Sequence, residues 1–158
     1  IIDMDEIFLQ RAVDLAQANL ALGEGGPFGA VIVRNGQIIA EGWNQVVASN
    51  DPTAHAEVVA IRIATAKLGR FHLDDCVLYA SSEPCPMCLS AAYWARVQRI
   101  VFANTRAEAA AIGFCDDELY CELTKAHDAR KVPTEHLPLP GADAPLKAWL
   151  ADPGHVNY

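Results

Sequence analysis

The sequence lacks any apolar run that approaches the roughly 18 consecutive residues needed to cross a bilayer, so no transmembrane helix and no membrane association are expected. The first ten residues, IIDMDEIFLQ, contain neither a basic region nor a cleavage site and are not expected to be a signal peptide. Internal repeats, low-complexity segments and interdomain linkers are absent as well. The 158 residues are therefore predicted to form a single domain, 1–158.

Positive charge is also scarce. The chain has 12 lysine and arginine residues against 20 aspartate and glutamate residues, a formal net charge of −8, and shows no basic stripe. Proteins bind nucleic acids largely through lysine and arginine side chains that neutralise phosphates. The charge balance therefore predicts no nucleic-acid partner, although it leaves room for a local basic patch.

Cysteine is present in an odd number, five. Together with the absence of a secretory signal, this indicates a reducing compartment, so a cytoplasmic location is expected. In that setting a close pair such as Cys85 and Cys88 is more often a metal or redox site than a disulfide. Cys76, Cys115 and Cys121 are expected to be buried apolar residues rather than metal ligands.

Hydrophobic periodicity and turn residues predict helices that alternate with strands. The two apolar runs around Asn35-Gly36 indicate a β-hairpin. The order favours a three-layer α/β/α domain with a central mixed sheet of about five strands, the first two antiparallel. The predicted elements are a helix over 5–22, the hairpin over 30–43, a helix over 54–68, a strand over 76–82, a helix over 86–97, a strand over 99–104, and helices over 105–112, 116–126 and 146–151.

A Cys-x-x-Cys pair stands at the start of the predicted helix 86–97. Residues three apart lie on one face of a helix, so the sulfurs of Cys85 and Cys88 can meet one ion. The partial positive charge at a helix N-terminus favours thiolate over thiol. By itself the pair leaves three readings open: a redox pair, a structural zinc site and a chance pair.

His55 favours the metal reading, because it stands at the start of another helix, on the other side of the strand 76–82. In open α/β sheets such helix starts can lie side by side beyond the strand ends. One imidazole and two thiolates are three protein ligands for a tetrahedral Zn²⁺, with the open fourth position that a catalytic zinc requires. A second C-x-x-C or an H-x-x-x-H motif, which a structural zinc site would need, is absent.

Glu57 follows His55 by two positions, a rotation of ~200° around a helix, which places its side chain beside the metal rather than on it. Zinc lowers the pKa of a bound water to about 7, and a neighbouring carboxylate can move that proton to a substrate. The H-x-E and P-C-x-x-C motifs together are typical of zinc nucleobase deaminases. The alternative reading is a helix-capping Glu57, a polar His55 and two buried thiols.

Several longer segments extend this pattern: GGPFGAVIV, SNDPTAHAEV, EPCPMCL, YWAR and AAAIGFCDD. With them the sequence resembles the bacterial guanine deaminases of the cytidine deaminase-like zinc-dependent superfamily, over nearly the whole chain. The resemblance implies hydrolytic deamination of guanine to xanthine and ammonia by a zinc-bound hydroxide. It also implies that His55, Cys85 and Cys88 are the zinc ligands and that Glu57 is the proton shuttle.

The resemblance further assigns substrate-binding residues. Asn44 matches a substrate-contacting asparagine, and Asp116 matches an acidic residue that recognises the purine and takes part in proton transfer. Phe28 and Trp94 match aromatic positions near the pocket. From the residues alone, Asn44 could equally be a turn former and Asp116 a helix N-cap. Cys115 departs from the acidic residue expected before Asp116.

The C-terminal tail, 153–158, completes the resemblance. It implies that Tyr158 closes the active site of the other subunit in a domain-swapped homodimer. From composition alone a terminal residue would be expected to be disordered.

Other functions share the zinc motif. A tRNA adenosine deaminase should carry basic residues where this sequence has CDDELYCEL. A guanosine deaminase, or a deaminase of another aminated heterocycle such as a triazine, fits the motifs as well. A zinc-stabilised binding module without catalysis is the alternative outside the enzymes, and it predicts that Glu57→Gln leaves function intact.

Overall fold

The structure, a computed structural model, describes residues 3–158. Contacts divide the chain into two compact units, Ile1–Leu119 and Tyr120–Tyr158, which are described one at a time. Within the described residues, no helix combines the length and the apolar character needed to cross a membrane. That residues 1–158 act as one domain stays a prediction.

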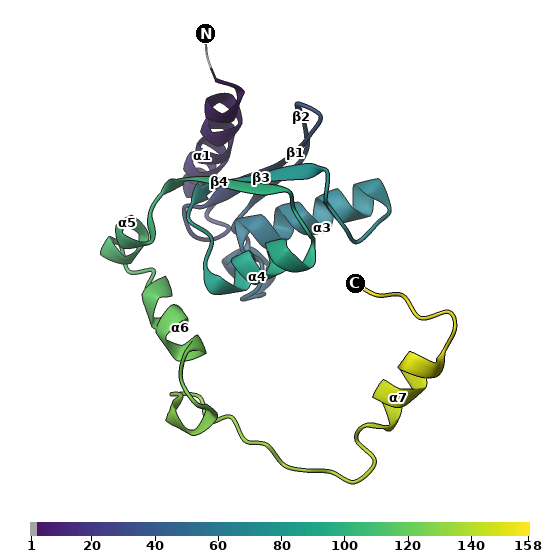
Figure 1. The fold of residues 1–158 in the computed structure, drawn as a ribbon. Coiled ribbons are helices and arrows are strands. Elements are labelled where there is room, and N and C mark those ends of the chain that lie inside the picture. The colour runs from purple at the N-terminus through teal and green to yellow at the C-terminus, as the bar shows by residue number, and fades with distance from the viewer. Residues whose placement is uncertain (1–2) are drawn as a thin grey trace. The chain divides into compact units, whose positions relative to one another are not determined.

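The first unit contains the sheet and most of the helices (Figure 1). Its elements are α1 Met4–Leu22, β1 Gly29–Arg34, β2 Gln37–Trp43, α2 Val46–Ser49, α3 Ala56–Leu68, β3 Cys76–Ser82, α4 Pro86–Trp94, β4 Arg99–Asn104, α5 Arg106–Ala111 and the first half of α6 Asp116–Leu123. The helix predicted to reach residue 97 ends at Trp94, because Arg96 adopts a left-handed backbone conformation with φ 59°. The short helix α2 was not predicted.

The sheet has the strand order β2-β1-β3-β4. Strand β1 is antiparallel to both β2 and β3, and β3 is parallel to β4, so the sheet is mixed as predicted. Four strands form it within residues 3–158, rather than about five, because the chain after β4 continues into helices α5 and α6. Asn35 and Gly36, with φ 50° and 73°, form the predicted hairpin turn between β1 and β2.

Each face of the sheet is covered by helices, which gives the predicted three layers (Figure 1). Alternate residues of β1 point to opposite faces. Val31 and Val33 pack with Phe8 and Leu15 of α1, and with Tyr79 of β3.

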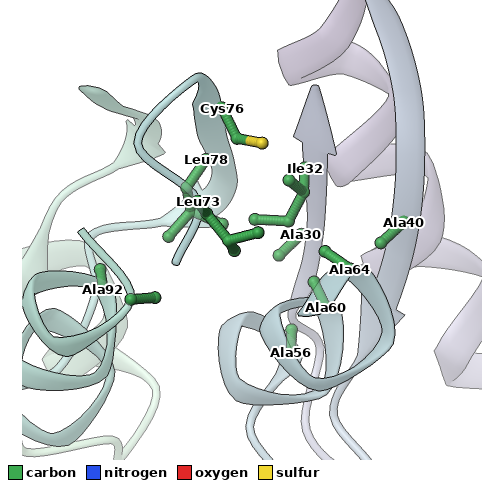
Figure 2. Packing of buried hydrophobic residues seen from close by; sticks show 11 residues of the cluster. Ala30, Ile32, Ala40, Ala56, Ala60, Ala64, Leu73, Cys76, Leu78 and Ala92 are labelled. Carbon is green, nitrogen blue, oxygen red and sulfur yellow. The ribbon is translucent and has the colours of Figure 1, made fainter. Parts of the chain in front are cut away.

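On the other face the sheet packs against α3 and α4 (Figure 2). Small side chains bring α3 close to the sheet, since a Cβ on Gly42 would lie 2.4 Å from the carbonyl oxygen of Ala56. This close packing determines where the first turn of α3 lies. The buried residues of this core are Ala30, Ile32, Ala40, Ala56, Ala60, Ala64, Leu73, Cys76, Leu78, Ala92 and Ala95.

One edge of the sheet gathers the segments that carry the predicted site. The end of β3 lies beside the start of β1, where the hydroxyl of Ser81 accepts a hydrogen bond from the amide of Gly29 at 3.0 Å. The end of β2 lies beside the same start, with Gly29 opposite Trp43. The parallel strand β4 ends beside β3, with Asn104 opposite Ser82.

The second unit contains the end of α6, the 3₁₀ helix η1 His127–Ala129 and α7 Ala144–Ala151. After α7 the chain turns back on itself. The ring of His155 stacks on Trp149 with centroids 4.2 Å apart, and the Nδ1 atom of His155 lies 2.7 Å from the carbonyl oxygen of Asp152. The large apolar side chains of α7 and of the segment before it are exposed, so this unit has no hydrophobic core of its own.

Candidate active site

His55, Cys85 and Cys88 form a cluster at the N-termini of α3 and α4. His55 is the N-cap of α3 and Cys85 is the N-cap of α4, with Pro86 in the first turn. The Nδ1 atom of His55 lies 3.6 Å from the sulfur of Cys85 and 3.5 Å from that of Cys88. All three donor atoms lie within 4.8 Å of one another, as the motif spacing predicted.

These three donors fit a tetrahedral zinc ion. Zinc binds histidine nitrogen at about 2.1 Å and thiolate sulfur at about 2.3 Å, so two such ligands in tetrahedral directions lie about 3.6 Å apart. The two nitrogen–sulfur distances, 3.6 and 3.5 Å, agree with this value. Both cysteines are buried and the imidazole is partly exposed, which leaves one side of the cluster open to a ligand.

The charges of the cluster also favour a cation. The thiol of Cys88 and the imidazole of His55 donate hydrogen bonds that lower the pKa of Cys85 to about 4. The hydrogen bond to Cys85 raises the pKa of His55 in turn. The pKa of Cys88 is raised, because this thiol lies next to the Cys85 thiolate and is buried. A second thiolate therefore needs a positive ion to balance it.

Glu57 lies in the first turn of α3, beside the cluster, and is buried. Burial raises the pKa of its carboxyl group, against a smaller opposite effect of a hydrogen bond with Cys88. A raised pKa lets a carboxyl group hold a proton at a higher pH than a free one does and release it again, as general acid–base catalysis requires. The position and the environment of Glu57 therefore suit a proton shuttle.

A small cavity of about 60 Å³ opens in front of the cluster. The structure brings His55, Cys85 and Glu57 to its wall together with three further predicted residues. The residues that line it are Phe28, Asn44, His55, Glu57, Ser82, Glu83, Cys85, Phe114 and Asp116.

Asn44 is both a turn former and part of the cavity wall. Its side chain is 5% exposed, and its Oδ1 atom accepts a hydrogen bond of 3.1 Å from the amide of Val46 at the start of α2. The backbone amide of Asn44 donates a hydrogen bond of 3.1 Å to the carbonyl oxygen of Phe28. The two readings of Asn44 that the sequence left open are therefore compatible.

Asp116, rather than its neighbour Asp117, lies at the cavity. Burial raises the pKa of Asp116. The exposed carboxylate of Asp117 instead forms an ion pair with Arg106 at 3.6 Å, and Arg106 also pairs with Glu83 at 3.2 Å. These ion pairs connect the start of α5 to the residues after β3, next to the segment that carries Asp116.

The aromatic wall consists of Phe28 and a residue that the sequence analysis missed, Phe114. Their rings meet edge to face with centroids 4.8 Å apart. Trp94 does not line this cavity; it is 64% exposed and borders a separate groove with Tyr93 and Leu89. The structure thus provides no support for Trp94 near the pocket, and its substrate role stays a prediction.

Other differences from the expectations are smaller. Ser82 and Glu83 line the cavity but were not predicted, although they directly precede the Pro-Cys pair. Cys115 and Cys121 are exposed rather than buried. Tyr158 belongs to the second unit, so its predicted role at an active site stays untested.

Comparison with known proteins agrees with this site. The family described as the cytidine and deoxycytidylate deaminase zinc-binding region matches residues 2–104. Guanine deaminase of Bacillus subtilis is 53% identical over 144 residues, which cover 91% of this chain and 92% of that protein. A tRNA-specific adenosine deaminase of Haemophilus influenzae is 40% identical over 120 residues, 73% of this chain and 69% of that protein.

Solved structures give the same picture. The crystal structure of the Bacillus subtilis guanine deaminase matches with a TM-score of 0.94 and 50% identity, and covers 97% of this chain and 98% of that one. A guanine deaminase structure from Nitrosomonas europaea matches with a TM-score of 0.66 and 36% identity, over 69% of this chain and 63% of that one. The protein is therefore a member of the cytidine and deoxycytidylate deaminase zinc-binding family.

Proposed function

We propose that this protein is a zinc-dependent guanine deaminase that hydrolyses guanine to xanthine and ammonia. The observation that supports this most directly is the meeting of a His/Cys/Cys cluster, Glu57 and Asp116 around one cavity. The likeness to guanine deaminase also extends beyond residue 104, where the match to the zinc-binding region ends, to the part of the chain that carries Asp116.

We assign His55, Cys85 and Cys88 as the ligands of one zinc ion. When bound, zinc supplies a water-derived nucleophile at neutral pH. Glu57 takes the first proton of the attacking water and delivers it to a ring nitrogen of guanine. It then takes the remaining proton of the added hydroxyl group and gives it to the amino group, which leaves as ammonia when its bond to the ring carbon breaks. Water and guanine are thereby converted to xanthine and ammonia with no net loss or gain of protons.

The remaining residues of the wall recognise the base. The carboxylate of Asp116 is a suitable acceptor for the N–H groups of a purine, and the amide of Asn44 can donate to and accept from a purine edge. The rings of Phe28 and Phe114 offer apolar surface for the flat base. The partly buried position of Asp116, at the same cavity as His55 and Cys85, also suits the predicted part in proton transfer.

Ammonia release by the zinc-loaded protein tests the substrate. The panel is guanine, guanosine, adenine, cytosine, cytidine and aminotriazines, and selective turnover of guanine is expected. Turnover of guanosine or of a triazine alone would contradict the assignment of the pocket. No turnover in this panel, together with deamination of adenosine in a tRNA tested separately, would favour the tRNA deaminases. The net charge of −8 and the smaller share of the chain that they match weigh against them.

We further propose that the protein is a homodimer in which the tail, 153–158, covers the cavity of the partner chain. The exposed leucines of the second unit support this, because a segment without a core must bury its apolar side chains elsewhere. These residues are Leu137, Leu139, Leu146 and Leu150. A cytoplasmic location stays a prediction from the cysteine content.

Removal of residues 153–158 is expected to raise the KM for guanine by at least about tenfold, because the cavity loses its cover and exchanges with water. Steady-state kinetics and light scattering check the result. The matched control is Lys147→Ala. It removes only the ion pair between Lys147 and Asp143, which is 2.6 Å long and lies on the exposed side of α7. Unchanged kinetics after truncation, or a fully active monomer, would contradict the proposed lid.

Gly25→Ala is expected to weaken guanine binding by at least about tenfold while zinc stays bound. An added Cβ at Gly25 would lie 2.0 Å from Oδ1 of Asn44, far inside contact distance, so the Asn44 side chain must move. The KM for guanine and the zinc content per chain measure the two expectations. Normal KM in a folded Gly25→Ala protein would show that the position of Asn44 does not matter for binding.

A further inference from the structure

Asn19 is a buried polar side chain in α1 that the proposed mechanism does not use. It is 0% exposed, and its Nδ2 atom donates two hydrogen bonds, each 2.9 Å long, to the carbonyl oxygens of Gly26 and Asn44. The helix ends just beyond it, where the amide of Gly23 donates to the Asn19 carbonyl at 2.8 Å. Backbone carbonyl oxygens inside a protein need hydrogen-bond donors, and here the side-chain amide of Asn19 donates to two of them.

The two carbonyls belong to two different segments, each of which contributes one residue to the cavity wall, Phe28 and Asn44. Gly26 lies two residues before Phe28, and its carbonyl also accepts from the Phe28 amide at 2.8 Å. Asn44 itself lines the cavity, and its backbone amide donates a hydrogen bond of 3.1 Å to the carbonyl oxygen of Phe28. The amide group of Asn19 therefore connects the segment before β1 with the segment after β2.

Asn19 is connected to the cavity wall but does not line the cavity itself. Asn19 is not among the residues that line the cavity, whereas Phe28 and Asn44 are. The metal cluster and Glu57 belong to α3 and α4, which are positioned by the alanine-rich core on the opposite face of the sheet. A change at Asn19 should therefore move the base-binding wall and leave the metal cluster in place.

We propose that Asn19 is a positioning residue for substrate binding, which acts through Asn44 and Phe28. The inference rests on the proposed function for the identity of the substrate. It assigns to the buried face of α1 a role in holding the base, besides its role in covering the sheet.

Asn19→Leu tests the inference, because leucine has a similar size but no donor. The KM for guanine is expected to rise by at least about tenfold, since the buried carbonyl of Asn44 loses this donor and the carbonyl of Gly26 keeps only the Phe28 amide. The turnover number is expected to change by less than about threefold, and the zinc content to stay at one per chain, because Glu57 and the cluster are not displaced. Should this variant not fold, Asn19→Ser removes the same amide with a smaller change.

Phe8→Leu is the matched control, because Phe8 is buried on the same helix but packs on Tyr79 with ring centroids 5.3 Å apart. It should lower stability without a change in KM. In an Asn44→Ala background, Asn19→Leu should add much less to KM than in the wild type. An equal rise in KM in both backgrounds, or a rise no greater than that of Phe8→Leu, would overturn the inference.

Hydrogen exchange provides a readout that does not depend on activity. The amides of Phe28 and Asn44 are expected to exchange faster in Asn19→Leu than in a Phe8→Leu protein of equal stability. If the wild-type protein does not deaminate guanine, the proposed function is wrong, and the exchange rates alone then decide the role of Asn19. Equal exchange in the two variants would overturn that role.

Discussion

Glu57→Gln is expected to lower the turnover number for guanine by about three orders of magnitude while one zinc ion per chain stays bound. Glutamine has the shape of glutamate but cannot accept and release a proton, and general acid–base catalysis contributes typically 10²–10⁴-fold. Glu57 is also not one of the three clustered donors, so the metal should remain. Ammonia release and metal analysis on the same preparation measure both effects.

Glu6→Gln is the control for this substitution, since it makes the same chemical change in the first turn of α1, outside the cavity. It should leave turnover and zinc content unchanged. A Glu57→Gln protein that holds its zinc and turns over guanine at a nearly normal rate would rule out the proton-shuttle role. Glu57 would then be only a structural residue in the first turn of α3.

Cys88→Ser is expected to abolish zinc retention and, with it, activity. The cluster offers three protein donors, and loss of one leaves His55 and Cys85 alone to bind the ion. A serine hydroxyl does not ionise near neutral pH, so it cannot replace the thiolate. Zinc binding also stabilises the folded state, so the melting temperature should fall to that of the metal-stripped wild type.

Metal analysis after dialysis against a chelator measures the effect of Cys88→Ser. Cys121→Ser is the control, because Cys121 is exposed and is not part of the cluster. It should retain zinc as the wild type does. Stoichiometric zinc in Cys88→Ser under conditions in which the wild type also retains it would contradict the assigned ligand set.

The parts of the fold that local sequence determines were predictable. The hairpin follows from Asn35-Gly36, because few residue pairs adopt two positive φ angles in succession. The metal cluster follows from three residues at helix starts, because the ends of neighbouring elements meet at one edge of an α/β sheet. The number of strands was predicted less well, because the sequence pattern gave ranges for only four strands and the expected fifth had no segment of its own.

The parts that depend on tertiary contacts were not predictable in the same way. Trp94 was placed near the pocket by resemblance, yet it follows the buried Ala92 by two positions, about 200° around the helix, and is exposed. Phe114 and Asn19 have no local signal, because their roles depend on rings and carbonyls that are distant in sequence. Asp116 and Asp117 are adjacent, and only tertiary contacts distinguish them: Asp116 lines the cavity, whereas Asp117 pairs with Arg106.

The central claim is that the cluster of His55, Cys85 and Cys88 and the carboxyl group of Glu57 together deaminate guanine. Its most direct test is to measure xanthine and ammonia formed from guanine by the zinc-loaded protein, by the metal-stripped protein and by the stripped protein after zinc is restored. One xanthine and one ammonia per guanine are expected, with activity lost on stripping and regained with zinc. Unchanged guanine in the presence of protein that carries one zinc per chain would contradict the claim.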